Sequence, residues 1–237
     1  MDLSDIISDA IVYPFHNLAS LAIFMIIGIV GGILGGASIL GALASYSGHN
    51  MLASSGFGII GIIIGLLAYL LISGYTLDVV KYGIERRSDG PGLDVVRQIT
   101  NAVKVIIICI VYYLIPTIIS ALLRFLLGNG ILTTIIIFII IIVFAFAQFM
   151  ATCRLAKYDS LGEALAIGEA IGDISKVGML KVLATVLIVL VIGIIIATII
   201  ALIMNFNNII GGILLGIFGV YFVFFYNRAV GLLYSQV

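Results

Sequence analysis

Side chains that could do chemistry are few in this sequence and stand apart from one another. The two histidines, His16 and His49, have no cysteine or carboxylate at metal-ligand spacing in their own segments. The His-Glu-x-x-His pattern of membrane metalloproteases is absent, and no serine stands in a Gly-x-Ser-x-Gly setting. The sequence therefore predicts a protein that is not an enzyme, with no metal and no other cofactor.

Four carboxylates between residues 159 and 173 come in pairs that are four residues apart. Asp159 with Glu163, and Glu169 with Asp173, would share helix faces. Such pairs could hold a cation, but the same pattern is typical of a solvated helix face, which is the interpretation we favour. Ser160 and Glu163 also form a capping-box pattern, which predicts that a helix begins there.

Arg124 lies near the far end of an apolar segment. A charged side chain in a membrane span is costly unless it reaches the interface or meets a partner. We favour a role for Arg124 in setting the topology, and keep contact with an anion or a lipid headgroup as the alternative. Cys109 and Cys153 lie inside or at the edge of apolar segments, which predicts buried thiols.

The composition indicates lipid as the solvent for most of the chain. Of 237 residues, 63% are hydrophobic and 9% are charged, whereas a soluble domain has about 25% charged residues. A span needs about 20 apolar residues, and six segments qualify: 18–44, 57–77, 102–127, 131–151, 177–204 and 209–231. The net charge is zero, so nothing favours nucleic acid, and the expected partner is the bilayer.

Glycines four residues apart recur in these segments. Such spacing stacks glycines on one helix face and lets a second backbone come close. The predicted helix-packing positions are Gly28, Gly32, Gly36, Gly61, Gly65, Gly212 and Gly216. An alternative is that Gly31-Gly32 and Gly35-Gly36 break the first helix and expose its carbonyls to a substrate.

The chain has a repeating layout. Stretches 2–17, 93–104 and 161–176 are amphipathic, and each precedes two apolar segments joined by a short turn. We predict an all-α polytopic membrane protein with six transmembrane helices as three helical hairpins, each preceded by a cytoplasmic amphipathic helix. Residues 1–237 would form one integral membrane domain, with possible repeats 1–82, 83–158 and 159–237. Pro14 and Pro116 predict a bend and a kink.

Basic residues predict the orientation. The side that would hold both termini carries ten of them, and the other side carries Arg124 alone. The ten are Lys81, Arg86, Arg87, Arg97, Lys104, Arg154, Lys157, Lys176, Lys181 and Arg228. By the positive-inside rule both termini are cytoplasmic. We expect Asp78, Arg154 and their neighbours at the span ends to extend toward water.

Several short motifs resemble an uncharacterised archaeal membrane family, the domain of unknown function 4013. They are Asp-Ala-Ile-Val-Tyr-Pro at residues 9–14, Gly74-Tyr75 followed by Val79 and Lys81, residues 101–104, and Gly231 with Tyr234. Asp78 stands where the resemblance would place a basic residue. The family has no established activity, so the resemblance implies a multi-pass architecture and an archaeal origin.

Two functions fit these observations. The first is a non-catalytic structural, assembly or partner-binding component of the cell membrane, with a membrane-protein partner or a second copy of the chain. It rests on abundant packing residues and on the lack of charge within the spans. The alternative is a transporter or channel for a small solute, suggested by the repeats and the glycine-rich first span. A polar cavity at bilayer depth would favour that alternative.

Overall fold

The chain is all α-helical in the computed structural model, which describes residues 1–48 and 51–237, apart from the side chains of residues 32–33, 35–40, 42–44, 51–52 and 208–209. The long helices are α2 (Leu18–Ser47), α3 (Met51–Ile84), α4 (Val95–Leu127), α5 (Ile131–Tyr158), α8 (Met179–Phe206) and α9 (Asn208–Tyr234). Three shorter helices accompany them: α1 (Leu3–His16), α6 (Leu161–Ala164) and α7 (Ile167–Val177).

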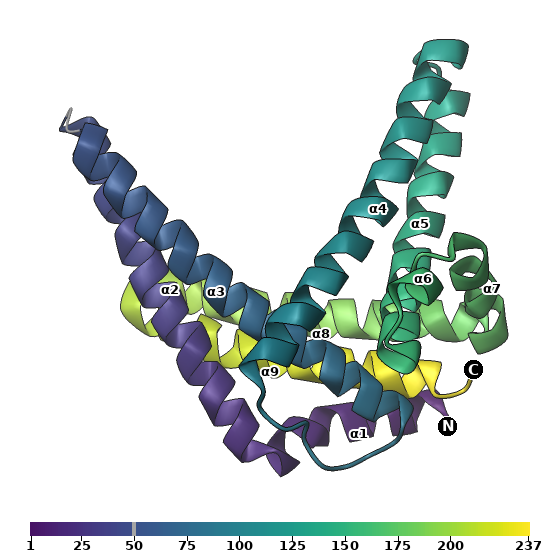
Figure 1. The fold of residues 1–237 in the computed structure, drawn as a ribbon, viewed down its shortest axis with the longest axis horizontal. Coiled ribbons are helices and arrows are strands. Elements are labelled where there is room, and N and C mark those ends of the chain that lie inside the picture. The colour runs from purple at the N-terminus through teal and green to yellow at the C-terminus, as the bar shows by residue number, and fades with distance from the viewer. Residues whose placement is uncertain (49–50) are drawn as a thin grey trace.

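Consecutive long helices pack side by side and spread out from a common region (Figure 1). α2 lies along α3, α4 along α5, and α8 along α9. The pair α2–α3 and the pair α4–α5 diverge toward their tips, whereas α1, α6, α7 and both ends of the chain gather at the opposite end. We call this end the base: helices α1, α6 and α7, residues 85–94, and the adjoining ends of α3, α5 and α9.

Several helices can cross a bilayer. Among the described residues, five are long and apolar enough, and there are six if a bent pair is one span. The bent pair is α1 with the first part of α2, which meet at 80° just after the predicted bend at Pro14. A polytopic membrane protein accounts for these helices.

Exposed and buried residues are reversed relative to a soluble protein at the start of α4. Val96 is 76% exposed, whereas Gln98 is 2% exposed and Asn101 lies buried. Water would favour the opposite arrangement, but an apolar surface costs nothing in lipid. This arrangement is what a helix needs when lipid surrounds it.

Two of the predicted amphipathic helices take a different form. The stretch 93–104 is not a separate helix, because α4 runs without a break from Val95, where Asp94 caps it by accepting from the Arg97 N–H. The stretch 161–176 is divided into α6 and α7, because the chain leaves the helical path after Ala164. Only the first stretch forms one short helix, α1, which buries Ile6 and Ala10.

The core lies mostly at and near the base. One part is an aromatic stack in which the Tyr75 ring lies 4.3 Å from that of Phe24 and 5.2 Å from that of Phe224, joining α3 to α2 and α9. A larger part gathers small and branched side chains from α1, α4, α5, α7, α8 and α9. The helix pairs are therefore joined at one end, and their outer lengths face outward.

Candidate functional site: buried ion pairs at the base

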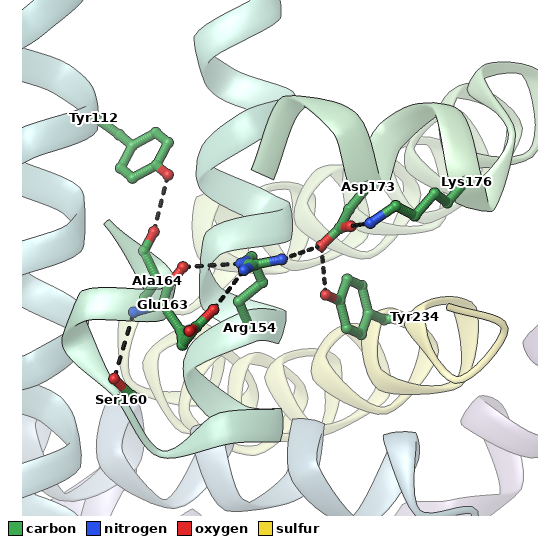
Figure 2. Close-up of polar contacts among 8 residues, drawn as sticks. All are labelled: Tyr112, Arg154, Ser160, Glu163, Ala164, Asp173, Lys176 and Tyr234. Carbon is green, nitrogen blue, oxygen red and sulfur yellow. Dashed lines mark hydrogen bonds and ion pairs between the residues drawn. The ribbon is translucent and has the colours of Figure 1, made fainter. Parts of the chain in front are cut away.

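Arg154 is the centre of a buried polar cluster (Figure 2). Its side chain on α5 is 7% exposed, and it donates from Nη1 to Asp173 Oδ2 at 3.0 Å. It also donates from Nε to the Glu163 carbonyl at 2.8 Å and from Nη2 to Glu163 Oε2 at 2.6 Å. One guanidinium thus ties α5 to α6 and α7.

Asp173 completes the cluster with two further partners (Figure 2). It is fully buried, and it accepts hydrogen bonds from Lys176 Nζ at 2.7 Å and from the Tyr234 hydroxyl at 2.6 Å. Tyr234 brings α9 into the cluster. The two cations and two carboxylates balance, which is the condition under which buried charges are tolerated.

The electrostatics favour the ionised form of Asp173. Burial by itself raises the pKa of the carboxyl, but hydrogen bonds from Lys176, Tyr234 and Arg154 outweigh it and hold the pKa below its usual range. The Asp173 carboxylate likewise raises the pKa of Lys176. Asp173 and Lys176 are therefore both ionised at neutral pH.

Arg228 forms a second buried ion pair, at the end of α9. Its side chain is 2% exposed, and it holds Asp9 of α1 through Nε at 2.7 Å and Nη2 at 3.3 Å. Nη1 donates to the carbonyls of Tyr82 and Arg87 at 3.2 and 2.6 Å. The guanidinium also lies 4.4 Å from the Tyr13 ring centroid. This pair fastens α1 and the chain after α3 to α9.

Asp78 forms the third pair, in which the acidic residue precedes the basic one in the chain, the reverse of the order in Arg154–Asp173. It is 8% exposed on α3, and it accepts from Arg97 Nε at 3.1 Å and from Asn101 Nδ2 at 3.0 Å, both on α4. Partners in the Asp78–Arg97 and Arg154–Asp173 pairs are separated by the same nineteen residues. Each pair joins the end of a long helix to the segment that follows it.

These positions correct the expectation that charges at the span ends extend toward water. Asp78, Arg154 and Arg228 are buried because partners reach them from elsewhere in the base. Asp173 is not on a solvated face, and Glu163 pairs with Arg154 although half exposed. Ser160 does cap α6 by accepting from the Glu163 N–H. For Asp78–Arg97 and Arg154–Asp173 the sequence signal was the shared spacing of nineteen residues, which is seen only when the span ends are compared.

The predicted packing glycines are divided in the structure. A methyl group added at Gly28 would lie 3.0 Å from Val220 Cγ2, and one at Gly216 would lie 2.8 Å from Ile29 Cγ1, so α2 and α9 come close there. Gly61 is buried in α3. Gly65 and Gly212 face open space among the described residues, so helix packing at these two positions stays a prediction. Gly32 and Gly36, like His49, lie outside the residues whose surroundings are described.

The tightest helix contacts lie at glycines that were not singled out as packing positions. A methyl group at Gly74 would overlap the Gln98 carbonyl oxygen, and one at Gly231 would overlap the Val80 carbonyl oxygen. Both contacts are with backbone, which cannot move aside as a side chain can. Spacing by four residues does not identify them, because each depends on where the partner helix crosses.

A polar cavity of about 340 Å³ lies between α3, α4, α5 and α9. Its polar lining includes Ser73, Thr76, Gln148, Thr152 and Asn227, and Gln148 Nε2 donates to Cys109 Sγ at 3.2 Å. Cys109 is half-buried and Cys153 is fully buried, as predicted. Transport was expected to use a polar cavity lined by the first, third and fifth spans, but of these only the third, α4, lines this cavity.

The chemistry available at the base is that of paired charges. Among the described residues, no group of three histidine, cysteine or carboxylate side chains could hold a metal ion. Arg124 lies far from the base, exposed near the end of α4. The base binds helices to one another through the buried charges of Arg154, Asp173, Arg228 and Asp78.

Comparison with known proteins gives one match. Residues 57–205 match the sequence model of a family described as a protein of unknown function, DUF4013. Neither the curated proteins nor the solved structures give a match.

Proposed function

We propose that this chain, which belongs to the family of unknown function DUF4013, is a non-catalytic integral membrane protein that serves assembly with a membrane partner. The observation that carries this proposal is the base, where Arg154, Arg228 and Asp78 are buried and paired. Buried charges that are paired within the protein help to hold its helices in one arrangement. The helix pairs then offer long apolar sides to a partner or to lipid.

The repeats belong to the same proposal. In a three-hairpin scaffold, each hairpin would end in a charged residue that binds the next segment. The equal separations of Asp78–Arg97 and Arg154–Asp173 support this arrangement. The Arg228–Asp9 pair would close the set by joining the last hairpin to α1. The short helices at the base would be its cytoplasmic face.

The experiment measures the size and composition of the protein extracted from native membranes in a mild detergent. We expect an assembly with one defined membrane partner, or a defined number of copies, by cross-linking and mass photometry. An Arg154→Met variant should insert but lose the assembly, whereas the exposed Glu169→Gln change should keep it. A wild-type protein that behaves as a single chain would contradict the proposal.

Orientation can be tested separately. We infer a position in the cell membrane with the base and both termini in the cytoplasm, because basic residues concentrate at that end. In a variant without Cys109 and Cys153, a cysteine at Asn129 should react with an impermeant maleimide from outside intact cells. A cysteine at Glu85 should react only after lysis, and the reverse pattern would overturn the inference.

Transport of a small solute is the second candidate, because of the polar cavity around Gln148. Amide and hydroxyl groups of this kind can replace the hydration of a solute within a bundle. Flux of chloride, glycerol and urea through reconstituted liposomes would test it. Flux of any of these solutes that is lost in Gln148→Leu would favour transport over assembly. If none of the three solutes crossed faster than in liposomes without protein, this alternative would be excluded.

A further inference from the structure

A lateral groove of about 260 Å³ follows α4 and α5 toward their tips. Tyr112 and Ile137, which are 2% and 5% exposed, lie deepest in it. Tyr113 and Ile141 also line it but are 75% and 50% exposed. A groove with such an exposed rim along a membrane helix opens to lipid, and its natural occupant comes from the bilayer.

The lining changes character along the groove. Ile137, Ile141 and Phe144 provide an apolar wall on α5, and Arg124 provides a cation at the far end. Among the described lining residues there is no carboxylate to neutralise this cation. An apolar wall that ends in a cation matches an amphiphile with an anionic head.

Ser120 supplies an independent observation. Its Oγ atom is buried and has no hydrogen-bond partner among the described residues, and it lines the groove one turn of α4 before Arg124. A buried hydroxyl without a partner is unfavourable, because it has lost its hydrogen bonds to water. A phosphate oxygen held by Arg124 would give this hydroxyl an acceptor.

The length of the groove fits a lipid of one leaflet. Residues 112–124 of α4 cover about 18 Å at about 1.5 Å per residue, and half of the hydrocarbon layer is about 15 Å thick. The cationic end lies toward the turn between α4 and α5, at residues 128–130. A headgroup there would sit at the interface, with its chain directed toward the bilayer centre.

We propose that this groove binds one anionic phospholipid of the leaflet opposite the base. The phosphate is held by Arg124 and Ser120, and one acyl chain lies over Ile137, Ile141 and Phe144. The site depends on the membrane placement of α4 and α5, but not on the assembly role proposed above.

The test is titration of delipidated protein in detergent with long-chain phosphatidylglycerol, read by native mass spectrometry. Arg124→Gln should weaken binding at least tenfold, because it removes the charge-assisted hydrogen bonds to the phosphate. Ser120→Ala should weaken it severalfold. Arg86→Gln, which removes an exposed arginine at the base, should leave it unchanged. Thermal melting of each variant shows whether the fold is kept.

Four outcomes would overturn the proposal. Equal losses for Arg124→Gln and Arg86→Gln would mean that general surface charge attracts the lipid. Equal binding of dihexanoyl and long-chain phosphatidylglycerol would mean that no acyl chain lies in the groove. Displacement of the lipid by millimolar inorganic phosphate would mean that the site takes a free anion. If Arg124→Gln weakened the binding of phosphatidylcholine as much as that of phosphatidylglycerol, the site would not distinguish the charge of the headgroup.

Discussion

Asp173 contributes more to the stability of the base than a surface carboxylate could. Its Oδ2 accepts from both Arg154 and Tyr234, and its Oδ1 accepts from Lys176. We expect Asp173→Asn to lower the free energy of unfolding by about 3 kcal/mol, because it leaves the buried guanidinium without its main counter-charge. Glu169→Gln, an exposed change on the same helix, should have little effect on unfolding in detergent. Equal effects would contradict the assignment.

The same carboxylate predicts how stability depends on pH. The pKa of Asp173 is lower in the folded protein than its ordinary value of 3.8, so the unfolded chain binds the proton more readily. Its contribution is fully present above about pH 4 and is lost as the pH falls below 3.8 through the folded pKa. Unfolding measured from pH 7 to pH 3 should therefore show a shallower acid loss in Asp173→Asn than in the wild type.

For single residues, the sequence predicted the positions of the charges along the chain but not the partners that surround them in the fold. Arg154 was placed correctly at a span end, yet it was expected to reach water. A side chain at a helix end has the same local sequence whether it reaches water or a buried partner. The deciding residue, Asp173, lies nineteen positions away in another helix, and its contact depends on how α6 and α7 fold back.

Helices α3 and α4 meet at a point where there is no room for a side chain. A methyl group at Gly74 would overlap the backbone of Gln98, so Gly74→Ala should force the helices apart and cost about 1–3 kcal/mol. Gly65→Ala on the same helix faces open space and should be neutral or stabilising, since alanine favours helix by about 1 kcal/mol. Unfolding of the two variants gives the comparison, and a stable Gly74→Ala protein would refute the contact.

The elements themselves were largely predictable, and their packing was not. Apolar runs and the turn at residues 128–130 predicted each long helix, because lipid demands about twenty apolar residues in sequence. The bounds agree to within a few residues for α2, α8 and α9, whereas α3 is longer at both ends, α4 begins seven residues earlier and α5 ends seven residues later than predicted. Of the glycines spaced by four residues, Gly28 and Gly216 lie where α2 and α9 come close, whereas Gly65 and Gly212 face open space. Small residues permit a close contact, but the crossing of the partner helix decides which of them is used.

Across the whole molecule, the base accepts both polarities of ion pair. Asp78 binds Arg97, whereas Arg154 binds Asp173. Exchanging the charges in Asp78→Arg with Arg97→Asp should therefore restore at least half of the stability lost in either single change. The Asn101 amide, which now donates to Asp78, can turn to offer its oxygen to arginine. A double variant no more stable than Asp78→Arg, in a double-mutant cycle, would show that only one polarity fits.

The ion pair between Arg228 and Asp9 can form only late in the synthesis of this protein. The two residues are 219 positions apart, so a ribosome releases one of them long before it can supply the other. Until then α1 has no clamp, and the earlier helix pairs enter the bilayer with their inner ends unsecured. Biogenesis should pass through an open, protease-sensitive stage that closes only when α9 has been inserted.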